Sequence, residues 1–162
     1  MKRMNPRGFN ANYQGRPTPE DGEFFKRSWI EAGAYHNINQ LPENLRIYAA
    51  SDHAVGQKQE NDRTCLMVVG VDERDHIWIL PDIFWERAGT DVIVEKMIDM
   101  MDLHKPLTWW GENDHIIKSI GPFLMKRMQE RGVYCSVEPV SPAGQDKRRR
   151  AQAIKGRMSM GM

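Results

Sequence analysis

Two acidic residues, Asp52 and Glu112, each close an apolar stretch with the pattern of a β-strand. Residues 45–52 alternate between two faces, and residues 107–112 form a second short apolar run. If the two strands are parallel neighbours, both carboxylates lie at the same end of one sheet. Carboxylate oxygens are ligands that Mg²⁺ and Mn²⁺ prefer. Two such metal ions bound about 3.5–4 Å apart catalyse phosphodiester hydrolysis. The sequence therefore predicts a metal site suited to cleaving phosphodiesters.

Three further residues are candidates for this chemistry, and each has a structural alternative. Asp82, in a third strand-like run, either adds a metal-binding oxygen, faces solvent or pairs with Arg87. Asp146 opens a basic helix and is either an additional metal ligand or the residue that caps that helix. His53 follows Asp52 in the position of a general base, although an exposed loop histidine is the simpler interpretation.

The last nineteen residues are strongly basic, whereas the chain as a whole carries a net charge of only +1. Residues 144–162 have a net charge of +5, so the rest of the chain carries −4. A basic segment beside an acidic body fits a site that holds metal and receives a polyanion; a solvated helix face explains the charges equally well. In the first case four consecutive side chains neutralise DNA phosphates, namely Lys147, Arg148, Arg149 and Arg150.

The spacing of apolar residues predicts five strands and three helices in the order β-β-β-α-β-α-β-α. Short turns favour an antiparallel meander for the first three strands, and intervening helices favour parallel pairing of the first, fourth and fifth. This order predicts an α/β fold of the ribonuclease H type, a mixed five-stranded sheet with flanking helices and the first strand beside the fourth. The expected strands are 45–52, 64–71, 76–83, 107–112 and 133–140; the expected helices are 90–105, 114–131 and 145–162.

Local signals set the expected ends of these elements and the surroundings of the site. Thr90 is expected to cap the first long helix, which should stop before Pro106, and Gly132 should end the second. Trp109 and Trp110 should pack on opposite faces of the sheet.

The composition indicates one domain with an extra segment. Residues 1–44 are expected to form an extended arm with one short helix at 24–34, and residues 45–162 to form the catalytic domain. Cys65 and Cys135 lie in apolar runs, which favours buried free thiols over a disulfide or metal site. No run of about 18 apolar residues occurs, so no transmembrane helix is expected, and the N-terminus lacks the apolar stretch of a secretory signal.

An ordered set of short motifs along nearly the whole chain resembles the nuclease domain of the large terminase subunit of tailed bacteriophages. Each motif is short, and the order gives the set its specificity. The motifs are Asn12-Tyr-Gln14 with Pro17, Gly22-Glu-Phe-Phe-Lys-Arg-Ser-Trp29, Ser51-Asp-His-Ala54, Asn61-Asp-Arg-Thr64, Trp110-Gly-Glu112, Ile120-Gly-Pro-Phe-Leu124, and Asp146-Lys147 with Arg150-Ala-Gln152.

This resemblance implies a two-metal endonuclease that uses Mg²⁺ or Mn²⁺, with Asp52 and Glu112 as ligands, and that cuts concatemeric viral DNA during genome packaging. It implies double-stranded DNA, an ATPase motor domain, a small terminase subunit and a portal as partners, in the cytoplasm of the host of a phage or prophage. No Gly-x-x-x-x-Gly-Lys-Ser/Thr phosphate loop occurs, so the family's motor domain is missing here. The family's third acid would follow Gly161, so we expect a chain truncated at its C-terminus and poorly active alone.

Two other functions remain open from the sequence. The chain could be another ribonuclease H-like enzyme, such as a resolvase or integrase, although the motifs between Asn12 and Trp29 argue against this. It could also be a non-enzymatic module that binds nucleic acid or supports assembly and keeps the fold without the chemistry. Metal binding would separate the second alternative from the two nucleases.

Overall fold

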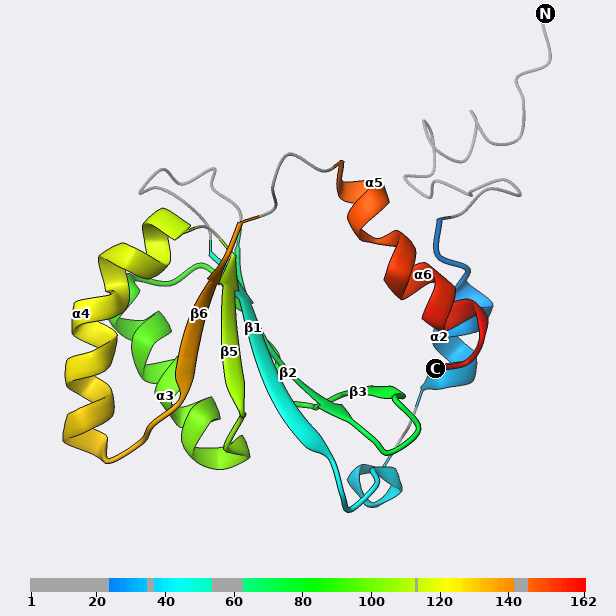
Figure 1. Cartoon of the computed structure of the whole chain (residues 1–162), viewed down its shortest axis with the longest axis horizontal. Coiled ribbons are helices and arrows are strands. Elements are labelled where there is room, and N and C mark those ends of the chain that lie inside the picture. The colour runs from blue at the N-terminus through cyan, green and yellow to red at the C-terminus, as the bar shows by residue number, and fades with distance from the viewer. Residues whose placement is uncertain (1–23, 35–36, 54–62, 113, 142–145) are drawn as a thin grey trace, which may run out of the picture. The chain divides into compact units, whose positions relative to one another are not determined.

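The computed structural model describes residues 24–34, 37–53, 63–112, 114–141 and 146–162, with backbone only for 114–117 and 119 (Figure 1). Its internal contacts divide the chain into two units. The sheet domain spans His36–Asp146, and the terminal unit combines Met1–Tyr35 with Lys147–Met162. The arm motifs before residue 24, the turn at 17–22 and most of the loops at 53–63 and 141–144 lie outside the described residues.

The sheet domain is built on a mixed six-stranded sheet. The strands are β1 (Arg46–Asp52), β2 (Thr64–Val71), β3 (Ile77–Ile79), β4 (Phe84–Glu86), β5 (Thr108–Glu112) and β6 (Ser136–Val140). Their order is β3-β2-β1-β5-β6, with β4 also paired to β2. Strands β1, β2, β3 and β4 pair antiparallel, whereas β1, β5 and β6 are parallel. This confirms the predicted ribonuclease H-type α/β arrangement with β1 beside the predicted fourth strand.

The predicted five-stranded sheet was wrong in its third strand, because residues 76–83 do not form one continuous strand. Strand β3 ends at Ile79, and β4 begins at Phe84 and pairs with a different part of β2. Pro81 lies between them and has no N–H to donate to the sheet. The chain turns there instead, with the N–H of Ile83 donating to the carbonyl of Pro81 at 2.9 Å.

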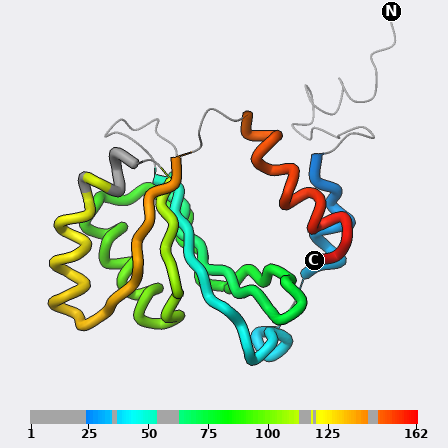
Figure 2. The backbone as a smooth tube through the Cα atoms, viewed as in Figure 1, coloured from blue at the N-terminus to red at the C-terminus, as the bar shows by residue number. Residues whose placement is uncertain are grey.

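Two long helices, α3 (Thr90–His104) and α4 (Asp114–Arg131), pack on each other and on the same side of the sheet (Figures 1 and 2). Helix α3 contacts β2, and α4 contacts β5 and β6. We call the face of the sheet beneath these two helices the covered face. Its buried strand residues include Ala49, Ser51, Leu66, Val68, Trp109 and Gly111. Because side chains alternate along a strand, the intervening residues form the opposite face.

We call this opposite face the open face. Large apolar side chains on it are partly or fully exposed. The exposed ones include Ile77, Ile79, Trp85 and Trp110. The sheet therefore has one face that closes the core and one face that stays accessible within the sheet domain. The strand residues of the open face are Arg46, Tyr48, Ala50, Asp52, Cys65, Met67, Val69, Val71, Ile77, Ile79, Trp85, Thr108, Trp110, Glu112, Ser136, Glu138 and Val140.

The helix ends follow local chemistry with one difference from expectation. Gly89 is the N-cap of α3 and Thr90 its first residue, so Thr90 is not the cap. The helix stops before Pro106 as predicted, with Lys105 in the left-handed region at φ 49°. Gly132 follows α4 at φ 63°, which agrees with the predicted glycine stop.

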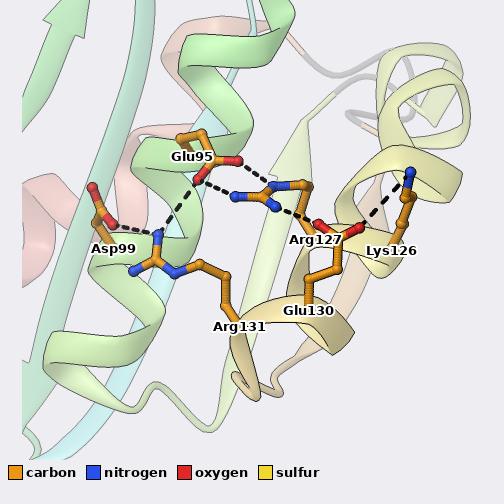
Figure 3. A network of polar contacts seen from close by, with 6 residues as sticks. All are labelled: Glu95, Asp99, Lys126, Arg127, Glu130 and Arg131. Atoms are coloured by element: carbon orange, nitrogen blue, oxygen red, sulfur yellow. Dashed lines mark hydrogen bonds and ion pairs between the residues drawn. The ribbon is translucent and has the colours of Figure 1, made fainter.

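A network of ion pairs ties the outer surfaces of α3 and α4 together (Figure 3). The Arg127 guanidinium contacts both carboxylate oxygens of Glu95, and Arg131 donates to Asp99 at 2.9 Å and to Glu95 at 3.4 Å. The hydrogen bond from Arg127 lowers the pKa of the Glu95 carboxyl. Because these charges are partly exposed, they fix how the helices lie on each other more than they stabilise the fold.

In the described residues of the terminal unit there are three short helices, α2 (Arg27–Gly33), α5 (Lys147–Arg150) and α6 (Gln152–Ser159). Helix α2 contacts α6, and the Lys155 ammonium lies 5.0 Å from the centre of the Phe24 ring. The predicted single basic helix is interrupted at Ala151, although backbone hydrogen bonds continue through it. None of the residues of these three helices is buried.

Within the described residues, no helix combines the length and apolar character that crossing a membrane requires.

Candidate active site

Asp52 and Glu112 are paired residues at the last positions of β1 and β5. The register is continuous from Ala49 opposite Trp109 to Asp52 opposite Glu112. Neighbouring strands lie about 4.8 Å apart, and paired residues of parallel strands project to the same face. The two carboxylates therefore share one edge of the open face, as the sequence predicted. Asp52 is exposed, and Glu112 is partly buried.

Tryptophans on both faces hold the ends of these two strands. On the covered face, the buried Trp109 Nε1 donates to Ser51 Oγ at 3.0 Å, which links β5 to β1 directly before the acids. On the open face, Trp110 stacks on Tyr48 with ring centres 5.3 Å apart and planes 23° apart. The expectation that the tryptophans pack on opposite faces is confirmed, and both support the same pair of strands.

His53 is not the exposed loop histidine that the sequence suggested, because its side chain is only 5% exposed. Burial lowers the pKa of its imidazole, and the nearby charge of Asp52 opposes that shift without reversing it. Its Nε2 atom has no hydrogen-bond partner among the described residues. Local sequence could not reveal this burial, which arises from packing at the end of β1.

Cys65 lies directly opposite Asp52 on β2. Burial raises the pKa of its thiol, and the Asp52 charge raises it further. A raised pKa keeps the sulfur protonated at neutral pH, and a protonated thiol is a poor nucleophile and metal ligand. Within this row of the sheet, the carboxylates are therefore better candidates for metal ligands than the thiol.

The other predicted site residues lie elsewhere in the chain. Asp82 contacts His104, with 2.8 Å between Oδ2 and Nε2, rather than Arg87 as one alternative had it. Asp146 is exposed and directly precedes α5, and the four basic residues Lys147 to Arg150 form that helix. In the part of the chain that the structure describes, no three His, Cys, Asp or Glu side chains are grouped to hold a metal ion. The described site is thus a two-carboxylate site.

Carboxylate oxygens from two adjacent strands fit a hard cation such as Mg²⁺ or Mn²⁺. Magnesium keeps several of its waters and is often held by one or two carboxylates together with substrate phosphates. Asp52 and Glu112 supply that number of ligands for one ion. A second ion would need a further ligand, for which Asp146 stays a prediction.

Sequence reasoning did not predict the contact between a basic and an aromatic residue, Arg63 and Trp85, in the same row of the sheet. Strand β4 places Trp85 opposite Cys65, and Cys65 lies opposite Asp52. The Arg63 guanidinium lies 5.1 Å from the centre of the Trp85 ring. The motif that contains Arg63 was visible in the sequence, but Trp85 was placed outside any strand, so the pairing could not be seen.

A hollow lies at the other end of β1, and a carboxylate in its lining stabilises a turn. Asp72, Arg74, His76 and Trp78 are among the residues that line it. The Asp72 carboxylate accepts hydrogen bonds from the N–H groups of Arg74 and His76, both at 2.9 Å, and from Trp78 Nε1 at 3.0 Å. These bonds lower the pKa of Asp72, with that from Trp78 the largest cause. The carboxylate fixes the turn between β2 and β3, away from Asp52.

No protein-family model matches the chain, and no curated protein sequence matches it. Among solved structures, the chain is similar to the fowlpox virus Holliday junction resolvase, with 18% sequence identity and a TM-score of 0.36. That similarity covers 68% of this chain and 72% of the resolvase chain. A likeness this distant carries no argument about chemistry, so the fold assignment rests on strand order and direction. By those criteria the sheet domain is a mixed α/β fold of the ribonuclease H type.

Proposed function

We propose that this chain is a metal-dependent DNA endonuclease that hydrolyses phosphodiester bonds at Asp52 and Glu112. One observation carries the proposal: the two carboxylates are paired residues at the ends of adjacent parallel strands, on the accessible face of the sheet. Ligands on adjacent strands are held by the sheet hydrogen bonds, which gives them the rigidity that a catalytic site needs.

The bound Mg²⁺ or Mn²⁺ would supply Lewis-acid stabilisation of the charge that develops on the phosphate and would lower the pKa of an attacking water. The protein's part is to hold and orient. Asp52 and Glu112 offer oxygen ligands from one face, and Ser51 with Trp109 fixes the strand ends behind them. Asp146 is our proposed additional ligand for a two-metal site, since it is an exposed carboxylate that begins the basic segment.

Helix α5 is proposed to bind the DNA backbone. Its four residues are all basic and all exposed, and such a cluster neutralises phosphates without reading bases. Replacing Arg148 and Arg149 by Ala should weaken DNA binding equally for unrelated sequences. It should also lower the slope of log affinity against log salt by about one to two units. An unchanged slope would assign these charges to a solvated helix face.

Within this class, we propose the role of a terminase large-subunit nuclease that cuts concatemeric viral DNA during packaging. The support is the ordered set of sequence motifs, which includes Ser51-Asp-His-Ala54 and Trp110-Gly-Glu112. The same proposal gives the chain a motor ATPase, a small terminase subunit and a portal as partners in the host cytoplasm. A junction-resolving nuclease of the same fold is the alternative.

Cleavage in Mn²⁺ or Mg²⁺ tests the activity and the substrate together. Cleavage of a plasmid duplex and of a synthetic four-way junction is measured for four proteins. These are wild type, Asp52→Asn, Glu112→Gln and the control Glu138→Gln. Glu138 lies opposite Trp110 on β6, so the control removes one charge from the same face away from the pair. We expect weak but metal-dependent cutting of plain duplex, in line with the poor activity expected of this chain alone, that is lost in the first two variants and kept in the control.

A strong preference for the four-way junction, with the same loss in Asp52→Asn and Glu112→Gln, would replace the terminase role by that of a resolvase. Cleavage that persists in both carboxylate variants would contradict the metal site itself.

A further inference from the structure

We propose that Arg63, held on the ring of Trp85, binds a backbone phosphate of the DNA within about two nucleotides of the scissile phosphate. This inference rests on the proposed nuclease function and adds a substrate contact to the same site. It begins from the cation–π pair, in which the Arg63 guanidinium lies 5.1 Å from the centre of the Trp85 ring.

The pair lies at the edge of the sheet that carries the two acids. Strand β2 is antiparallel to β1, so Arg63, directly before Thr64, lies at the edge where β1 ends at Asp52. Across the sheet, one row runs from Trp85 through Cys65 and Asp52 to Glu112. Paired residues share a face, so the tryptophan and both acids all belong to the open face.

The spacing of that row suits a DNA strand. Trp85 is two strands from Asp52, which corresponds to about 10 Å at ~4.8 Å per strand. Each nucleotide of one strand advances about 3.4 Å along the duplex axis. Because the strand also winds about that axis, successive phosphates are farther apart than this rise, so a phosphate bound by Arg63 would be within about two nucleotides of the one at the carboxylates. Arg63 would thus fix the direction in which the DNA crosses the open face.

Arg63 differs from the other arginines of the sheet domain whose partners are known. Arg46 pairs with Asp75, and Arg127 and Arg131 pair with acids of α3. Among the described ion pairs none includes Arg63, which rests on an aromatic ring instead. A cation–π contact restrains a guanidinium while its N–H groups stay available to an anion.

Exposure completes the argument. Trp85 is 62% exposed although it lies within a strand, and Arg63 is exposed beside it. A large aromatic side chain left exposed in the row that contains the acids gains little for the fold. It is well placed, however, to hold an arginine in one position before the substrate arrives, which lowers the entropy lost on binding.

Binding of a fluorescent 30-base-pair duplex, in Ca²⁺ to suppress cleavage, is measured against salt for the full chain and three variants. Arg63→Ala should lower affinity roughly tenfold at low salt, as expected for one charge-assisted contact, and reduce the log–log slope by about 0.9. Trp85→Leu keeps the charge, so it should lower affinity only about two- to fivefold with a smaller change in slope. Arg46→Ala, which removes one charge at the opposite end of β1, should leave the slope unchanged.

Cleavage in Mn²⁺ provides the second readout. Arg63→Ala should raise KM with kcat nearly unchanged, because the contact is made equally by bound substrate and transition state. If wild type binds and cuts DNA but Arg63→Ala behaves like Arg46→Ala in slope and KM, the Arg63 contact is overturned and the nuclease function stands. If wild type does not bind the duplex, both proposals are overturned.

Discussion

The two faces of the sheet differ most clearly at two consecutive residues, Trp109 and Trp110. Trp109 has 0% exposure on the covered face and donates its indole N–H to Ser51. Trp110 is 39% exposed on the open face and stacks on Tyr48. Helices α3 and α4 close the first face, so its residues determine stability. The second face carries Asp52 and Glu112, and many of its side chains are partly or fully exposed.

The largest expected effect is on the covered face. Trp109→Ala should lower the free energy of unfolding by about 3–5 kcal/mol, because it removes a fully buried aromatic side chain and leaves a cavity. Trp110→Ala is the matched control, since it makes the same chemical change one residue away. It should cost about 0.5–1.5 kcal/mol, mostly through the lost stacking on Tyr48. Urea unfolding followed by circular dichroism measures both, and equal losses would show that the two faces are not distinct.

A smaller effect is expected from the hydroxyl beneath the acids. Ser51→Ala leaves the buried Trp109 N–H without an acceptor, so we expect a loss of about 1–3 kcal/mol. Ser136→Ala removes an exposed hydrogen bond to Glu138 and should change stability by less than about 0.5 kcal/mol. Thermal unfolding compares the two variants. A cost for Ser136→Ala as large as that for Ser51→Ala would contradict the contrast between the faces.

The smallest expected effect is the pH dependence of the ion pairs between α3 and α4. Hydrogen bonding from Arg127 lowers the pKa of Glu95, so the pair stabilises the folded chain fully above the unfolded-state value of about 4.3. That stability is lost as the pH falls through the lower folded-state pKa. Wild type and Glu95→Gln should therefore differ by a constant amount at pH 6–8 and converge below about pH 4. A difference that grows on acidification would contradict the sign of this coupling.

The main frame of the site was readable from the sequence because it depends on local patterns. Two apolar strands that each end in an acid, separated by an antiparallel meander and a helix, favour parallel pairing with both acids at one edge. The structure places Asp52 opposite Glu112, as that reasoning required. The tryptophan pair was also predictable, because adjacent strand residues face opposite ways.

The remaining features depend on contacts between distant segments, which no local pattern records. His53 is buried by packing at the end of β1, although its polar neighbours suggested an exposed loop. Asp82 contacts His104 at the end of α3, which is 22 residues away along the chain. Pro81 splits the expected third strand, and only the resulting strand β4 brings Trp85 into the row that contains Asp52.

The most direct test is the stabilisation of the folded chain by Mn²⁺ in wild type, Asp52→Asn, Glu112→Gln and the control Glu138→Gln. A cation that binds only the folded state adds about 2.7 kcal/mol to the free energy of unfolding when its concentration is 100 times the dissociation constant. We predict that stabilisation in wild type and in Glu138→Gln, and its loss in Asp52→Asn and Glu112→Gln. No stabilisation of wild type, or the same stabilisation in all four proteins, would contradict a metal centre at Asp52 and Glu112.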